Sequence, residues 1–307
     1  MRPEQDPGLG KKFNKPVPRF LNPDGTYNIN RHGVDRGIRD LYKYLIDISW
    51  WSLLGYLLAV FIMINLLFAC LYSLMNSPFG HVTDDHTKFW NAFFFSTQTF
   101  TTLGYGALAP QTWISNLLAG IEAFLGLLFF AIATGLLYGR FSKSNSKISF
   151  SDKILLRPFE GTRAIMFKMV NQRDNVLLKT KVSCTLILND ENSGGLNKKY
   201  HRLDLVNDFV LFFPLTWTLV HKMDESSPLH TMTFQELTSR KAELVVFVET
   251  YDETYGHSIT QKHSYAGDQW LEKFKFDMNF SPNESGQIDL YLNQLNNISP
   301  IEESDQH

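Results

Sequence analysis

The most distinctive chemistry in the sequence lies in residues 101–106, which read Thr-Thr-Leu-Gly-Tyr-Gly. A stiff, extended segment whose backbone carbonyls point the same way can replace the water shell of a potassium ion. Such alignment requires backbone conformations that most residues avoid, and Gly104 and Gly106 adopt them freely. Thr102 can add a hydroxyl oxygen at one end of the row, and Tyr105 is suited to brace the segment from behind. Four copies around an axis would be needed to surround the ion.

The setting of this segment supports the same chemistry. Residues 89–100 are rich in aromatic side chains and long enough for a short re-entrant helix, and long apolar segments lie on both sides. Irregular backbone at membrane depth is tolerated only where protein buries it or where it lines a water-filled cavity. We therefore expect a selectivity filter. Its ion-coordinating residues are Thr102, Leu103, Gly104 and Tyr105, and Gly106 forms the turn that leaves it. The alternative is an extracellular loop with a chance glycine pair.

Two segments are predicted to span the membrane. Residues 49–75 contain no charged side chain, and residues 113–141 contain only Glu122 before Arg140. Each is long enough to cross a hydrocarbon core of about 30 Å. Residues 76–112 would then form an extracellular loop, a re-entrant pore helix and the filter.

Charge fixes the expected orientation. Lys and Arg are abundant before the first span and after the second, whereas Lys88 is the only one between the spans. By the positive-inside rule, both termini are expected in the cytoplasm of a multi-pass protein of the cell (inner) membrane. The formal net charge of −2 for 307 residues hides this segregation. We expect no nucleic-acid partner.

An amphipathic helix is predicted for residues 34–48, directly before the first span. One side carries the apolar residues, and the other carries charged ones that include Arg36, Arg39 and Lys43. Such a helix is typical of the membrane interface, where it would act as a slide helix. The alternative is an ordinary surface helix of a soluble domain.

The rest of the chain is predicted to be cytoplasmic. Residues 1–33 form an N-terminal segment, 142–157 a linker, 158–281 a domain of short strands, and 282–307 a polar, mobile tail. The strand candidates are residues 164–170, 176–188, 200–205, 210–219, 243–250, 258–265 and 273–280. Strands at this spacing, separated by turns, indicate an all-β sandwich. Cys70 and Cys184 are unsuited to pairing, which fits a reducing compartment.

With these residues in view, nearly the whole chain resembles the inward-rectifier potassium channel family, and its prokaryotic branch most of all. The resemblance rests on the interfacial helix, the filter and four further motifs, at residues 22–25, 138–141, 157–161 and 213–229. It implies a membrane α-helical two-span potassium channel pore, with a re-entrant pore helix and filter, plus a cytoplasmic all-β immunoglobulin-like sandwich domain. It also implies a homotetramer whose central pore conducts potassium passively.

The resemblance assigns roles within the second span. Phe130, Thr134 and Tyr138 recur every four residues along one helix face, which lines the cavity in the family. Tyr138 would form the constriction where the inner helices cross, although a tyrosine here could also belong to an interfacial aromatic belt. Two glycines of this span, Gly126 and Gly135, are expected to permit close helix packing, and the alternative is that they are bending points.

An ionisable residue within a span is costly unless it has a partner. We therefore expect Glu122 to lie behind the filter, hydrogen-bonded to the pore helix near Gln98. Both residues are predicted to support the filter.

Several positions depart from the animal members of the family. Gln98 and Leu108 replace an acidic residue and an arginine that form an ion pair in many of them, and the extracellular cysteine pair is missing. Phe130 and, by alignment, Lys179 stand where strong rectifiers carry acidic residues. Rectification depends on polyamines held by such carboxylates, so we predict weak polyamine block.

Regulation by anionic lipid, including phosphoinositide, is a further expectation. Basic residues cluster beside both spans, and each contributes ~1 kcal/mol of attraction near an anionic surface. The candidates are Arg36, Arg39, Lys43, Arg140, Lys143, Lys147 and Lys153. The simpler interpretation is that the same charges set the orientation of the two spans in the membrane.

Other classes of protein fit less well. A membrane-anchored binding module would not explain the aromatic segment that leads into residues 101–106. An enzyme is disfavoured because the histidines form no H-E-x-x-H or Cys-His pattern. A nucleotide-gated channel would need a G-x-G-x-x-G after a strand, which is missing. We expect no cofactor, with potassium as the permeant ligand.

Overall fold

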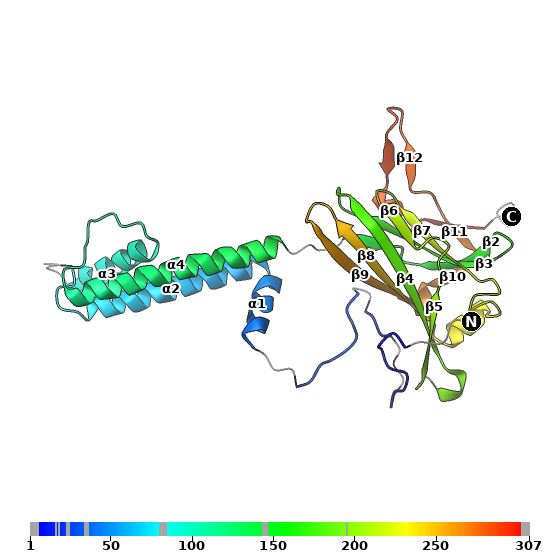
Figure 1. The fold of residues 1–307 in the computed structure, drawn as a ribbon, viewed down its shortest axis with the longest axis horizontal. Coiled ribbons are helices and arrows are strands. Elements are labelled where there is room, and N and C mark those ends of the chain that lie inside the picture. Colours follow the sequence, from blue (N-terminus) through cyan, green and yellow to red (C-terminus); the bar gives the residue numbers. More distant parts are fainter. Residues whose placement is uncertain are drawn as a thin grey trace. The chain divides into compact units, whose positions relative to one another are not determined.

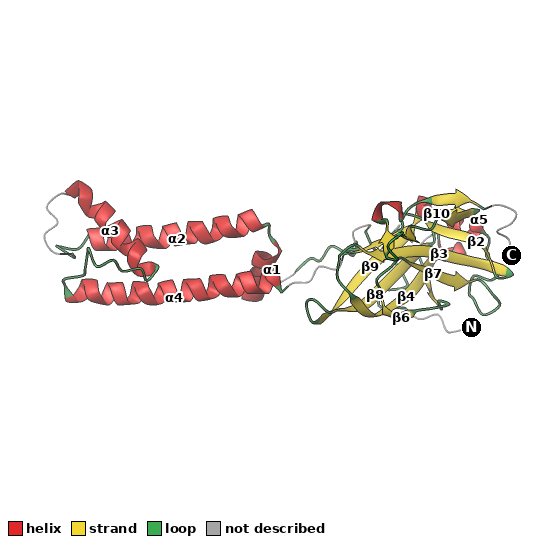
Figure 2. Cartoon of the chain, turned by 90° about the horizontal axis from the view of Figure 1, so that it is seen from above, coloured by secondary structure: helices red, strands yellow, loops and turns green. Residues whose placement is uncertain are grey.

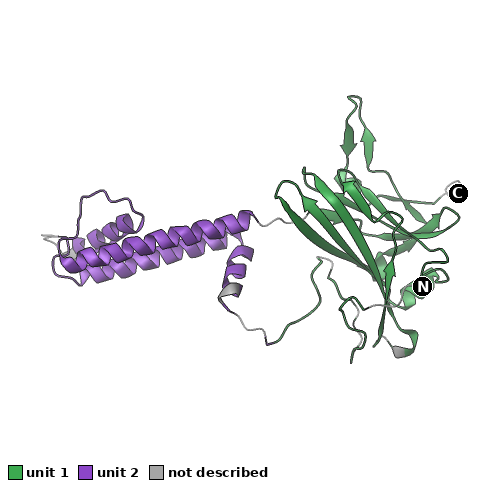
Figure 3. Cartoon of the chain, viewed as in Figure 1, with its two compact units in different colours: residues 1–32, 144–307 green, residues 33–143 purple. Residues whose placement is uncertain are grey.

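The computed structural model describes residues 6–15, 17, 19–22, 25–33, 37–79, 85–142, 147–194 and 196–301. The chain forms two compact units, coloured separately in Figure 3. One unit is Gly33–Lys143, and the other combines Met1–His32 with Ser144–His307. The N-terminal segment therefore belongs to the same unit as the C-terminal domain.

The described part of the first unit contains four helices: α1 (Ile38–Asp47), α2 (Trp50–Ser73), α3 (Asp85–Phe100) and α4 (Trp113–Phe141). Figures 1 and 2 show α2 and α4 alongside each other, with α3 beside them at the end away from α1. The two long helices begin at capping side chains. Ser49 accepts a hydrogen bond from the Ser52 N–H, and Thr112 accepts one from the Ser115 N–H.

Both long helices can cross a membrane. α2 has 24 residues and α4 has 29, so at 1.5 Å per residue they measure roughly 36 and 44 Å. Both are also apolar enough to span. The predicted spans match these helices, with the first starting one residue early and ending two residues late.

α1 is shorter than the predicted interfacial helix of residues 34–48. It begins at Ile38, and residues 34–36 lie outside the described part of the chain. Leu41 and Tyr42, on the predicted apolar side, are 56% and 52% exposed within the single chain. That exposure is what an interfacial helix needs on the side that meets lipid.

The second unit is built on two five-stranded sheets. The first sheet contains β1 (Ile148–Phe150), β3 (Thr162–Asn171), β2 (Ile154–Phe159) and β10 (Trp270–Glu272) in that order, with β7 (Trp217–Lys222) paired to β3. The second contains β5 (Lys198–Leu203), β4 (Leu177–Asn189), β8 (Glu243–Asp252) and β9 (His257–Ala266), with β6 (Phe209–Phe212) paired to β4. Most of the pairs are antiparallel, but β10 pairs with β2 in parallel.

Alternate residues of these strands enclose one apolar core. Ile165, Phe167 and Met169 of β3 are buried in it, as are Val246 and Val248 of β8, which is the period of two that a strand imposes. One short helix, α5 (Phe234–Ser239), adds Leu237 to the core. The predicted all-β sandwich is thereby confirmed.

The β domain extends beyond the predicted boundaries of residues 158–281. It starts with β1, and residues 283–301 are not the predicted mobile tail. β11 (Phe274–Phe276) pairs with β14 (Ile298–Pro300), and β12 (Phe280–Pro282) pairs with β13 (Ile288–Leu290). Short 3₁₀ turns occupy Glu191–Ser193, Gly267–Gln269 and Leu292–Gln294.

One predicted strand is divided. Residues 210–219 form the end of β6 and the start of β7, with Pro214 between them. Proline has no N–H to offer a ladder, so the strand ends there. Phe213 nevertheless stays buried in the core.

The N-terminal segment packs on the β domain. The buried Glu243 carboxylate accepts hydrogen bonds from the backbone N–H groups of Phe20 (2.9 Å) and Leu21 (3.2 Å). Phe20 packs with Ile187 and Tyr200 in a small second core. These residues tie the segment that precedes the helical unit to the β domain.

Candidate functional site

Residues 102–106 follow α3 directly and form no helix or strand. The backbone N–H groups of Leu103 (2.8 Å) and Gly104 (3.4 Å) both donate to the Gln98 carbonyl in the last turn of α3. The N–H side of the segment therefore faces its own helix.

The backbone of this segment alternates in handedness. Thr102, Gly104 and Gly106 have φ values of +57°, +54° and +78°, whereas Leu103 and Tyr105 are not among the described residues with positive φ. Alternation between left- and right-handed conformations turns successive N–H groups to one side and successive carbonyls to the other. A row of carbonyl oxygens along an ion path requires successive carbonyls on one side of the backbone.

Thr102 was not predicted to adopt a left-handed conformation, which is uncommon for a residue with a branched Cβ. Local hydrogen bonds hold it there: its N–H donates to the Thr99 carbonyl (3.1 Å). The neighbouring Thr101 hydroxyl donates to the Thr97 carbonyl (2.7 Å). The sequence pointed to Thr102 for its hydroxyl oxygen, and no local pattern predicted its left-handed backbone conformation.

In a single chain the segment is open. Leu103 is 54% and Tyr105 is 73% exposed. Both side chains are therefore accessible in the single chain.

α3 is held by aromatic packing. Phe95 contacts Tyr72 of α2 edge-on at 5.3 Å and Phe79 at 4.5 Å between ring centroids. Leu108 packs against the same cluster. The aromatic run of residues 89–100 thus fixes the helix on which the filter segment depends.

Glu122 is fully buried and reaches α3, but its partner there is Ser96 and not Gln98. Its other oxygen accepts a hydrogen bond from the Tyr72 hydroxyl (2.9 Å). Ser96 also lies 3.0 Å from Oδ1 of the buried Asn65. Sequence reasoning missed Tyr72, Ser96 and Asn65, although a polar residue within an apolar span was a signal for Asn65.

The two glycines of α4 differ. A Cβ on Gly126 would lie 2.1 Å from the Phe100 carbonyl oxygen, whereas a Cβ on Gly135 would meet no described atom within 4 Å. Close packing is therefore confirmed for Gly126, where α4 touches the end of α3. For Gly135 the expected contact is missing within this chain.

Phe130, Thr134 and Tyr138 all lie on exposed surface of α4. Tyr138 is 73% and Phe130 44% exposed. Phe130 also lies near the end of α3, with its ring centroid 6.4 Å from that of Phe100.

The basic residues fall into separate groups. Arg140 donates to the carbonyls of Leu45 (3.5 Å) and Ile48, and its guanidinium lies 4.6 Å from the centre of the Trp50 ring. It therefore joins the end of α4 to the α1–α2 corner. Lys43 is exposed on α1.

The other lipid-binding candidates lie elsewhere or are not described. Lys147 and Lys153 belong to the β-domain unit, where Lys153 donates to the Asp268 carbonyl (2.9 Å). Arg36 and Lys143 lie outside the described residues, and for Arg39 only the backbone is described.

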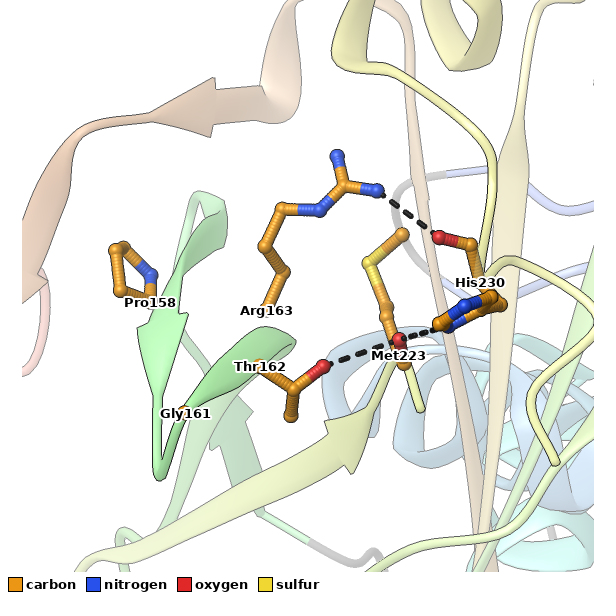
Figure 4. Close-up of a pocket in the computed structure, with 6 residues that line it drawn as sticks. All are labelled: Pro158, Gly161, Thr162, Arg163, Met223 and His230. Carbon is orange, nitrogen blue, oxygen red and sulfur yellow. Dashed lines mark hydrogen bonds between the residues drawn. The ribbon is translucent and has the colours of Figure 1, made fainter. Parts of the chain in front are cut away.

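Two sequence motifs of the β domain meet at a surface hollow of about 370 Å³, drawn in Figure 4. Arg163, just after the turn at residues 157–161, donates to the carbonyls of His230 (3.2 Å) and Met232 (2.9 Å). Thr162 donates to the Met223 carbonyl (3.2 Å). These bonds fasten the loop of residues 223–232 to the β2–β3 hairpin.

Comparison with known proteins assigns both units. The family model described as inward rectifier potassium channel C-terminal domain matches residues 148–306, and the one described as ion channel matches residues 50–143. The inward rectifier potassium channel Kirbac3.1 of Paramagnetospirillum magnetotacticum is 30% identical over 285 residues, covering 92% of this chain and 96% of that protein.

More distant proteins give weaker matches. The inward rectifier potassium channel irk-1 of Caenorhabditis elegans is 24% identical over 87% of this chain, and the match spans 54% of that protein. Among solved structures, the ApaA protein of Bordetella pertussis is 12% identical over 40% of this chain and 94% of that one, with a TM-score of 0.26. That likeness is too weak to carry an argument.

The two family models match consecutive parts of the chain that correspond to the two structural units, and Kirbac3.1 aligns along almost its whole length. The helices that the ion channel model matches include both membrane-crossing ones. The chain therefore belongs to the inward rectifier potassium channel family, whose members are membrane ion channels and not enzymes.

Proposed function

We propose that four copies of this chain form a potassium-selective pore, in which the carbonyl oxygens of residues 102–105 coordinate the ion. The observation that carries this proposal is the alternating backbone of residues 102–106, whose N–H groups at Leu103 and Gly104 turn back to Gln98. Carbonyl rings of this kind replace the water shell of potassium. A fourfold arrangement also accounts for the exposure of Leu103 and Tyr105 in one chain.

The test is rubidium uptake into liposomes that contain the purified tetramer. We expect uptake that barium blocks and that excess sodium does not compete away. Gly104→Ala should abolish uptake, because φ there is +54° and a side chain is strained in that region. Gly120→Ala is the matched control, since an added Cβ there meets nothing within 4 Å. Uptake by a Gly104→Ala tetramer equal to that of the control would contradict the filter assignment.

The proposed gate is Tyr138. Four such rings at the inner ends of the α4 helices would narrow the pore, in keeping with gating by an apolar constriction. The support is its 73% exposure on the face that it shares with Phe130 and Thr134. Tyr138→Ala should raise rubidium uptake, whereas Ile132→Ala, also exposed on α4, should leave it unchanged. Equal uptake by the two variants would argue against a gate at Tyr138.

Modulation by anionic lipid is proposed from the basic residues beside the spans, of which Lys43 and Arg140 are described within the helical unit. Lys43 is exposed and fit to meet headgroups, whereas Arg140 also holds the α1–α2 corner. Uptake should change when phosphoinositide is added to neutral liposomes, and the change should be smaller in Lys43→Ala. A response identical in that variant and the parent would remove Lys43 from the lipid site.

Both termini are proposed to be cytoplasmic, in the inner membrane of a prokaryotic cell. The support is the charge asymmetry, with Lys88 the only Lys or Arg between the spans. A protease added to spheroplasts, in which the outer face of the inner membrane is accessible, should leave the β domain uncut. Cleavage of the β domain by that protease would contradict the proposed topology.

A further inference from the structure

Four side chains form a continuous polar chain inside the otherwise apolar helical unit. Tyr72 and Asn65 come from α2, Ser96 from α3 and Glu122 from α4, and each is 0% exposed. Three helices therefore meet at one buried network. Burial of this kind is tolerated only if every donor and acceptor is satisfied.

The orientation of Asn65 is fixed by a backbone group. Its Nδ2 donates to the Phe61 carbonyl at 2.7 Å. The other amide atom, Oδ1, therefore faces Ser96 Oγ at 3.0 Å. Because Oδ1 is an acceptor only, the single hydroxyl proton of Ser96 belongs to this contact.

The other end of the chain is also determined. The Tyr72 hydroxyl lies 2.9 Å from Glu122 Oε2 and donates to it. Ser96 Oγ also contacts Glu122 Oε1, while its longer contact with the Asn65 carbonyl (3.3 Å) is again with an acceptor. Since the Ser96 proton is already used, the contact with Oε1 needs a donor on the glutamate.

We propose that Glu122 carries a proton on Oε1 and donates it to Ser96, so that one directed chain of hydrogen bonds runs from Tyr72 through Glu122 and Ser96 to Asn65. With an ionised carboxylate, two acceptors would face each other in a buried site, either at Oε1 or at Asn65. A charge there would also lack any cationic partner among the contacts described for Glu122, which is costly within a membrane.

The neutral network is a positioning device for the filter, and this role rests on the proposed function. Ser96 lies two residues before Gln98, whose carbonyl receives the N–H groups of Leu103 and Gly104. Glu122 lies one turn before Gly126, which touches the Phe100 carbonyl. The network thus locks the last turns of α3 against α2 and α4.

A neutral donor predicts an unusual pattern of variants. In Glu122→Gln, the amide can donate to Ser96 and its oxygen can accept from Tyr72, so every bond is kept. Barium-sensitive rubidium uptake, exclusion of sodium and tetramer melting should stay within about twofold or a few degrees of the parent. Glu122→Ala and Ser96→Ala leave buried partners unpaired, and about a tenfold loss of selectivity or a clear fall in tetramer melting is expected.

Infrared spectroscopy of the intact tetramer at neutral pH tests the proton itself. The parent should show the carbonyl stretch of a protonated, buried carboxylic acid, and Glu122→Gln should lack it. Absence of this band from the parent would overturn the proposal. So would a Glu122→Gln variant as impaired as Glu122→Ala. Because the band and tetramer melting do not depend on flux, they report on the network even if the protein fails to conduct.

Discussion

Gly126 is a point of close contact between α4 and the end of α3. The space available there is smaller than a methyl group, because the Phe100 carbonyl oxygen stands 2.1 Å from the place of a Cβ. Phe100 is itself buried and packs on Phe61 and Phe129 at 5.6 and 5.5 Å between ring centroids. The end of α3 therefore has little room to move aside.

Gly126→Ala is expected to displace the end of α3 and with it the filter segment. Overpacking of this kind costs about 1–3 kcal/mol, so tetramer melting should fall and rubidium selectivity over sodium should weaken. Gly120→Ala, which meets open space, should be neutral or slightly stabilising, because alanine is the better helix former. If both variants melt at the same temperature, the contact at Phe100 does not constrain the helix.

In the β domain, the His263 ring of β9 packs against aromatic side chains. It stacks on Phe150 at 4.7 Å and meets Tyr265 edge-on at 4.6 Å between ring centroids. Burial lowers the pKa of His263 to about 4, and the positive charge of Arg19 acts in the same direction. Its Nε2 is buried without a hydrogen-bond partner among the described residues.

This histidine makes the stability of the β domain depend on pH. In the unfolded state, the His263 imidazole takes up a proton as the pH falls below 6.5. In the folded state, it stays neutral until the pH falls to about 4. Stability is therefore fully present above pH 6.5 and falls as the pH drops toward 4. The melting temperature should drop by roughly 5 °C or more over this window. His263→Phe should flatten that dependence and His257→Gln should not; equally steep profiles in both would contradict the assignment.

At the scale of whole elements, the N-terminal segment is fastened to the sheet by Glu243. Its carboxylate is the acceptor for the N–H groups of both Phe20 and Leu21. Arg19 adds hydrogen bonds to the Ser264 hydroxyl (3.0 Å) and carbonyl. The segment that leads to α1 is thus held on β8 and β9.

Glu243→Ala is predicted to release this segment. Two buried N–H groups would lose their acceptor, at a cost of about 1–3 kcal/mol. Hydrogen exchange at residues 19–22 should speed up while the sheet amides of β4 and β8 stay protected. Glu249→Ala is the control, since Glu249 is exposed on the same strand. Unchanged exchange at residues 19–22 in Glu243→Ala would show that the remaining contacts hold the segment alone.

For the whole molecule, the main prediction concerns rectification. Phe130 is 44% exposed on the open face of α4, and Lys179 is exposed on β4, so neither position offers a carboxylate to a polyamine. Spermine should therefore block outward current weakly in planar bilayers.

Phe130→Asp would place four carboxylates around the cavity of a tetramer. The spermine concentration for half-block should fall at least about tenfold, which is 1.4 kcal/mol per channel. Phe130→Asn is the matched neutral control. If Phe130→Asn becomes as sensitive to spermine as Phe130→Asp, the size of the side chain and not its charge determines the block.

Much of the architecture followed from local rules. The two spans were predicted because apolar runs of this length have no other common use, and the core strands because their apolar residues alternate. The limits of the β domain were wrong because β13 and β14 are three-residue strands in polar sequence. β13 pairs with the nearby β12 in a hairpin, whereas β14 pairs with β11 across the intervening hairpin, and no local pattern predicts that second pairing.

The filter segment shows the same division. The sequence by itself determined Gly104 and Gly106 as positions of positive φ, because only glycine adopts that region without strain. Only the tertiary structure decided that Thr102 joins them and that Glu122 meets Ser96 and Tyr72 in place of Gln98. Which buried groups become partners depends on how three helices rotate against one another, and no spacing within one helix encodes that rotation.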